Sequence, residues 1–143
     1  MIVLDTTILV YAKGAEHPLR DACRRLIETV GRQEVEATTT PEVIQEFAHV
    51  MARRRGRADA TELAHAYADL LAPLLVVRDE QLRLGLRIFE RHDELRAFDA
   101  VLAAVALEAE TEALVTADAA FAVVDGLRTV TPGTGEFDAL LSG

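Results

Sequence analysis

The 143-residue sequence has one cysteine, one lysine, no tryptophan and no apolar run near the roughly 20 residues of a membrane-spanning helix. A single cysteine, Cys23, excludes an intramolecular disulfide and favours a reducing compartment. The N-terminus has no basic segment followed by a long apolar one, so no secretory signal peptide is expected. We therefore expect a cytoplasmic protein without a membrane segment.

Positive charge is also scarce, because 24 acidic residues outnumber 15 basic ones and the formal net charge is −9. Such a balance argues against broad electrostatic adhesion to nucleic acid. The basic residues are nearly all arginines, gathered in a few clusters. These clusters are either solvated helix faces or local patches that contact phosphate, which suits the planar guanidinium fork. The candidates for substrate contact are Arg53, Arg54, Arg55, Arg57, Arg83 and Arg87.

Short apolar segments alternate with amphipathic ones along the chain, which predicts one α/β domain over residues 1–143. Strands are expected at 2–4, 34–38, 73–77, 113–116 and 127–132, and helices at 6–13, 17–31, 41–55, 59–72, 80–92 and 98–110. Thr40 is expected to cap the third helix and Asp79 the fifth. We expect a three-layer sandwich: a roughly five-stranded parallel sheet with helices on both faces. Residues 132–143 are expected to form a loosely held tail.

Acidic residues recur where a parallel sheet would expose its carboxyl edge, which is where such sheets bind ligands. Asp5 follows the first strand, Asp118 follows the strand at 113–116, and Asp99 begins an alanine-rich helix. Glu46 borders the apolar stripe of its helix, whereas Glu42 points further toward solvent. Taken singly, these residues have ordinary explanations as helix caps, a turn residue and an arginine partner. Together they favour a divalent cation, because clustered carboxylates repel unless a cation neutralises them.

Four segments carry a family resemblance: "VLDTTILV", "VIQEF", "FDAVLAAVALE" and "LVTADAAF". In this order and spacing they resemble the PIN-domain ribonucleases, and most closely the VapC-type toxins of toxin–antitoxin pairs. The resemblance runs from residue 1 to about 132. It implies a PIN-like fold and endonucleolytic hydrolysis of RNA phosphodiester bonds by water activated at Mg²⁺ or Mn²⁺. It also implies a small antitoxin as partner and a homodimer.

The resemblance also implies roles for individual residues. Asp5 and Asp99 would bind the metal directly, Asp118 directly or through water, and Glu46 would hold the metal or the attacking water. Thr6 and Thr116 would orient the acids through their hydroxyl groups. This chain departs from many relatives at Thr7, where they carry asparagine. It also has Ala119 and Ala120 where some relatives carry a further acid, so occupancy of a second metal site stays open.

Other functions remain as alternatives. A haloacid-dehalogenase-type phosphatase also begins with an aspartate after its first strand, but it needs a second aspartate where this chain has Thr7. A response-regulator receiver needs an acidic pair at the first strand and a lysine after the last, and both are absent. A binding module of the same fold, with weak or no cleavage, stays open, as does the identity of the RNA.

Overall fold

The computed structural model describes all 143 residues and contains one parallel sheet of four short strands. The strand order is β2-β1-β3-β4, and every neighbouring pair is parallel. The strands are β1 (Ile2–Leu4), β2 (Ala37–Thr38), β3 (Ala113–Val115) and β4 (Thr129–Val130). All six residues of β1 and β3 are buried, as their unbroken apolar sequences predict for strands covered on both faces.

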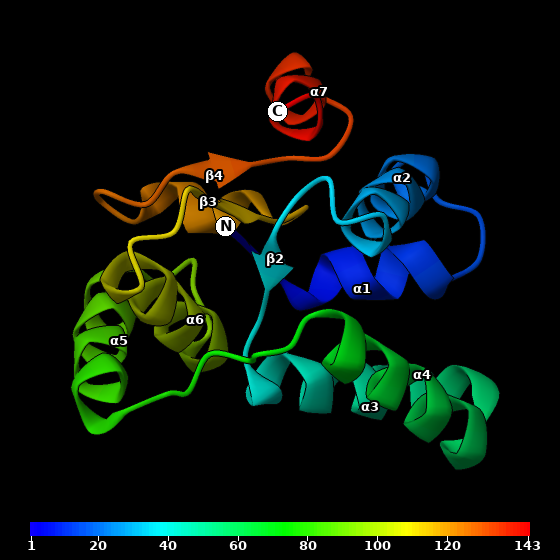
Figure 1. The fold of residues 1–143 in the computed structure, drawn as a ribbon. Coiled ribbons are helices and arrows are strands. Elements are labelled where there is room, and N and C mark those ends of the chain that lie inside the picture. Colours follow the sequence, from blue (N-terminus) through cyan, green and yellow to red (C-terminus); the bar gives the residue numbers. More distant parts are fainter.

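Seven α-helices and one 3₁₀ helix surround the sheet. They are α1 (Thr6–Lys13), α2 (Arg20–Gly31), α3 (Pro41–Arg55), α4 (Arg57–Leu70), α5 (Asp79–Arg91), α6 (Ala97–Glu108), η1 (Ala119–Val123) and α7 (Gly135–Leu141). Helices α3 and α4 pack against each other, as do α5 and α6, and α1 and α2. In Figure 1, α5 and α6 lie to the left of the strands, α1 and α2 to the right, α3 and α4 below them, and α7 at the top beyond β4. The predicted α/β fold with a parallel sheet is confirmed.

One apolar core of 32 buried residues joins the sheet to the helices. Helix α6 contributes a run of small residues, including Ala100, Ala103 and Ala104, all of them fully buried. Small side chains let a helix lie close to a sheet, which explains why this helix is alanine-rich rather than leucine-rich. Close packing of α6 fixes the position of its N-terminal turn, where Asp99 lies.

The strand predicted at 73–77 is wrong, which reduces the sheet from five strands to four. Pro73 has no N–H to donate, and Val76 is 64% exposed. The segment makes one backbone hydrogen bond beside β2, from Leu75 N–H to the Thr39 carbonyl. The strand predicted at 34–38 is shorter than expected, because only Ala37 and Thr38 pair with β1.

Two further expectations differ from the structure. Residue Arg78 occupies the N-cap of α5, and Asp79 is the first helical residue. The expected loose tail contains α7, which begins at a capping Thr134 and buries Phe137 completely. Residues 132–143 therefore pack onto the core, to which α7 contributes Phe137 and Leu140. No helix in the structure is both long and apolar enough to cross a bilayer.

Candidate active site

The carboxyl ends of the central strands bring the first acid and its partner together. Leu4 pairs with Val115 in register, so the next residues, Asp5 and Thr116, emerge side by side. The Thr116 hydroxyl donates a 2.8 Å hydrogen bond to Asp5 Oδ2. Asp5 occupies the N-cap position of α1, but its side chain makes no capping bond. The ordinary explanation of Asp5 as a helix cap therefore does not hold.

Thr7 forms a second bridge at the same place. Its hydroxyl donates to Asp5 Oδ2 at 2.9 Å and accepts the Ala117 N–H at 3.1 Å. Asp5 Oδ2 thus receives two hydroxyl donors, one from each strand end, which fixes the orientation of the carboxylate. Thr7, at which the family resemblance leads us to expect asparagine, thus makes polar contacts with both Asp5 and the turn after β3.

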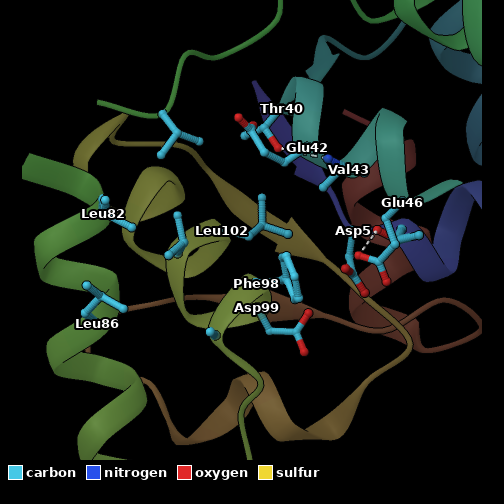
Figure 2. A pocket seen from close by; sticks show the side chains of 14 residues that line it. Asp5, Thr40, Glu42, Val43, Glu46, Leu82, Leu86, Phe98, Asp99 and Leu102 are labelled. Atoms are coloured by element: carbon cyan, nitrogen blue, oxygen red, sulfur yellow. Dashed lines mark hydrogen bonds between the residues drawn. The ribbon is translucent and has the colours of Figure 1, made fainter. Parts of the chain in front are cut away.

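Helix α3 supplies the glutamate. Its N-terminus is fixed by Thr40, whose side chain accepts the Val43 N–H, and by Pro41 at the first helical position, both as predicted. Two turns into the helix, Glu46 accepts a 3.2 Å hydrogen bond from the Thr6 hydroxyl through Oε2. Glu42 is exposed and lies beside Thr40 in Figure 2, away from Asp5. Glu46 is therefore the glutamate of α3 that faces Asp5.

The remaining two acids come from the C-terminal half of the chain. Asp99 lies in the first turn of α6 and is buried, and it makes no capping bond. Asp118 follows β3 and does act as a cap, because its Oδ1 accepts the Ala120 N–H at the start of η1. Its own N–H donates to Thr116, which ties the turn to the same hydroxyl that holds Asp5.

All four predicted acids line one pocket of about 220 Å³. Its lining comes from α1, α3, the start of α6 and the residues that follow β1 and β3, so tertiary structure alone brings these side chains together. Two predicted supporting residues belong to this region, Thr6 in the lining and Thr116 beneath Asp5. No three of the acids are arranged closely enough here to hold one metal ion. The lining is completed by two arginines, Arg54 and Arg96.

The pocket disfavours the charged forms of Asp5 and Asp99. Burial raises the pKa of Asp5 above its ordinary value, and the charge of Asp99 raises it further, against the two threonine hydrogen bonds. Burial also raises the pKa of Asp99, and this effect outweighs the neighbouring Arg96, with Glu46 and Asp118 adding repulsion. The charge of Asp99 therefore acts on Asp5, and the charges of Glu46 and Asp118 act on Asp99.

The donor set fits a hard divalent cation. Carboxylate and hydroxyl oxygens are the ligands that Mg²⁺ and Mn²⁺ prefer, and the lining contains no thiolate or imidazole. A bound cation would also relieve the repulsion that acts on Asp5 and Asp99. Asp5, Asp99 and Asp118 are the carboxylates that could hold it, once they approach one another more closely than in this structure.

The predicted arginines divide by position. Arg54 lines the acid pocket. Arg55 donates to the Lys13 carbonyl at the end of α1, and therefore acts as a helix cap. Arg53 and Arg57 are exposed near the junction of α3 and α4. On α5, Arg83 pairs with Asp79 one turn away at 2.9 Å, and Arg87 is exposed.

A second, largely apolar pocket of about 330 Å³ adjoins the acids. Figure 2 shows Leu82 and Leu86 at one end and Asp5 and Glu46 at the other, with Asp99 between them. Leu82 and Leu86 of α5 form an exposed wall of this pocket, 42% and 47% accessible, whereas Gly85 and Ile88 form the buried face of the helix.

Sequence reasoning missed two residues of the pocket. Arg96 carried a usable signal, because it lies three residues before Asp99 at a helix start, within reach of that side chain. For Thr7, the only signal in the sequence was its position two residues after Asp5. Its double contact depends on where the turn after β3 passes, which the sequence pattern does not reveal.

Comparison with known proteins agrees with this geometry. A family model described as PIN domain matches residues 2–127. Ribonuclease VapC7 of Mycobacterium tuberculosis is 49% identical over 145 residues, covering 99% of this chain and 98% of the relative. The crystal structure of Mycobacterium tuberculosis VapC20, described as a sarcin-ricin loop cleaving toxin, matches with a TM-score of 0.67 at 20% identity. That match covers 80% of this chain and 87% of the other, and shows a shared fold.

Proposed function

Because this chain belongs to the PIN-domain family and to its VapC proteins, as its motifs predicted, we propose that it is an endoribonuclease acting as the toxin of a toxin–antitoxin pair. The substrate is RNA, the site of action is the cytoplasm, and the products carry a 5′-phosphate and a 3′-hydroxyl. The observation that carries the proposal is the convergence of Asp5, Glu46, Asp99 and Asp118, from distant parts of the chain, on one pocket.

The cofactor is Mg²⁺ or Mn²⁺. When bound, a divalent cation supplies an activated water and offsets the charge that develops on a phosphodiester during hydrolysis. Asp5, Asp99 and Asp118 would hold it through carboxylate oxygens, after moving closer together than they stand here. Glu46, half-buried and held by Thr6, accepts a proton from the attacking water or orients it. Thr116 and Thr7 both donate to Asp5 Oδ2 and thereby keep the carboxylate in a fixed orientation.

The proposal is tested by incubating purified protein with total RNA and Mn²⁺. We expect cleavage by the wild-type protein and a loss on the order of 100-fold or more in Asp99→Asn, because a carboxylate that stabilises the cation is gone. The matched control is Asp125→Asn, which changes an exposed acid outside the pocket. Circular dichroism verifies that both variants fold.

Two results would refute the proposal: full activity in Asp99→Asn, or activity that survives exhaustive EDTA treatment. A folded wild-type protein that binds RNA without cutting it under any divalent cation would instead identify a binding module. Analysis of product ends separates the proposed hydrolysis from contaminating ribonucleases, which leave a 2′,3′-cyclic or 3′-phosphate.

The proposed partners are a small antitoxin and a second copy of the chain. The apolar pocket beside the acids offers an antitoxin segment the exposed side chains of Leu82, Leu86 and Phe98, the last 72% accessible. An antitoxin bound there would cover the entrance to Asp5 and Asp99. Co-expression with the antitoxin is expected to abolish cleavage, and Leu86→Glu to prevent that inhibition.

A further inference from the structure

Arg96 lies across two of the pocket acids. Its Nε donates to Asp99 Oδ2 at 3.1 Å, and one terminal nitrogen approaches Asp99 Oδ1 at 3.4 Å and Glu46 Oε1 at 3.3 Å. The side chain starts from the N-cap position of α6 and is 64% exposed, whereas that of Asp99 is 7% exposed. The guanidinium therefore covers the pocket from its solvent side.

These contacts differ from those of the other arginine–carboxylate pairs. The other pairs join two exposed side chains, or neighbours along the chain. Arg96 instead joins a buried acid of α6, Asp99, to a half-buried acid of α3, Glu46, which lies 50 residues before Arg96 in the chain. Both acids face the pocket that fits a cation, so the guanidinium supplies positive charge where a divalent ion would otherwise do so.

We propose that Arg96 is an internal counter-cation, which holds Glu46 and Asp99 in the metal-free protein and must leave them before a divalent ion can bind. This inference rests on the proposed function, because the competing ion is the cofactor of the nuclease. A guanidinium cannot release the acids by losing its proton, so it must move. Its exposure leaves it free to turn outward into solvent without disturbing the backbone of α6.

Two consequences follow from the competition. In the metal-free protein, Arg96 lowers the repulsion among acids that burial already disfavours, and thereby keeps the empty pocket folded. The same contacts lower the affinity for divalent cations, because binding must first break them. Once displaced, the guanidinium stands at the pocket mouth, where it can pair with a phosphate of the RNA.

The test is a titration of purified protein with Mn²⁺, following free Mn²⁺ by electron paramagnetic resonance. We expect Arg96→Ala to bind Mn²⁺ more tightly by on the order of tenfold, since two competing ion pairs are lost. The Mn²⁺ affinity of Arg96→Lys should lie between those of the wild type and Arg96→Ala, because an ammonium keeps the charge but cannot bind both acids with a planar guanidinium. Arg32→Ala is the control, since it removes a paired surface arginine outside the pocket, and should leave the affinity unchanged.

Thermal unfolding provides a second readout that does not depend on catalysis. In EDTA, Arg96→Ala should melt below the wild type, and saturating Mn²⁺ should raise its melting temperature by more. Equal or weaker Mn²⁺ affinity in Arg96→Ala would overturn the inference and make Arg96 a residue that positions Asp99. If the wild type cuts RNA and the affinities match, only this inference falls. If the wild type neither binds Mn²⁺ nor cuts RNA, the proposed function falls as well.

Discussion

At the scale of single residues, the pocket sets function against stability. Asp5 is 4% exposed and stands at the end of a fully buried strand, where a carboxylate is costly to desolvate. Three elements of local structure keep it there: the strand, the Thr116 hydroxyl and the Thr7 hydroxyl. An aspartate that merely capped α1 would turn toward the helix N–H groups. Asp5 makes no such capping bond, and its Oδ2 accepts the Thr116 and Thr7 hydroxyls instead.

Asp5→Asn therefore has opposite effects on activity and stability. Cleavage should fall on the order of 100-fold or more, because a carboxylate that holds the cation is lost. In EDTA near neutral pH, the variant should be more stable than the wild type, because the amide carries no buried charge and its oxygen still accepts both hydroxyl donors. Denaturant unfolding of both proteins measures the difference in free energy.

The pH dependence of that difference follows from the raised pKa of Asp5 in the folded state. Above this folded pKa, the charged carboxylate destabilises the wild type. As the pH falls through it toward the ordinary value of 3.8, the carboxyl takes up its proton in the fold first, and the penalty disappears. The advantage of Asp5→Asn should therefore shrink on acidification. An advantage that is absent at neutral pH, or constant with pH, would contradict this account.

The positions of the acids were predictable because parallel strands end at one edge. That rule predicted Asp5 and Asp118, whereas Asp99 was predicted from its place at a helix start and Glu46 from an inward-facing helix position. All four line the pocket. The roles of Thr7 and Arg96 were not predictable in the same way. Thr7 contacts a residue 110 positions away and Arg96 contacts one 50 positions away, and the periodicity of apolar residues predicts neither contact.

At the scale of elements, the closeness of α5 and α6 is the feature on which the site depends. Gly85 is buried at their crossing, where a Cβ atom would lie 2.6 Å from the Cα of Val101. That contact is with backbone, so it cannot be relieved by turning a side chain. Because α6 carries Arg96 and Asp99 in its first turn, the crossing also positions the pocket.

Gly85→Ala should destabilise the protein by about 1–3 kcal/mol, the usual cost of overpacking a core. Cleavage should fall along with stability, because α6 must shift to admit the methyl group. Gly31→Ala is the control, since nothing lies within 4 Å of a Cβ there and the residue ends a helix. It should be neutral or stabilising by up to about 1 kcal/mol. Urea unfolding measures these differences in stability. A Gly85→Ala variant as stable as the wild type would mean that α5 and α6 are further apart than the structure shows.

Elements were predictable where local chemistry and burial agree. Helix α3 begins where Thr40 and Pro41 predict, because both residues favour a helix start. The unbroken apolar sequences of β1 and β3 form strands, because both strands are buried on both faces. Residues 73–77 have strand composition but run past the edge of β2 and pair there only once. Helix α7 was missed because two glycines and a short length hide the burial of Phe137 and Leu140.

At the scale of the whole molecule, an acidic protein must hold a polyanion. The net charge of −9 repels RNA at long range, so attraction must come from local arginines. The structure separates the arginines that are free for this task from those that serve the fold. Arg24 and Arg55 donate to carbonyls of Ala12 and Lys13 at the end of α1, whereas Arg54 lines the acid pocket.

Arg54→Gln should therefore weaken RNA binding and reduce its dependence on salt. One lost phosphate contact lowers the slope of log K against log salt by about 0.7 for single-stranded RNA. Binding is measured by fluorescence anisotropy in the Asp99→Asn background with Mg²⁺, so that the RNA stays intact across the titration. Arg32→Gln, which changes net charge equally but removes an arginine paired with Glu34, should leave the slope unchanged. If both variants lower the slope equally, the effect comes from overall charge and not from Arg54. If neither does, the RNA backbone crosses another part of the surface.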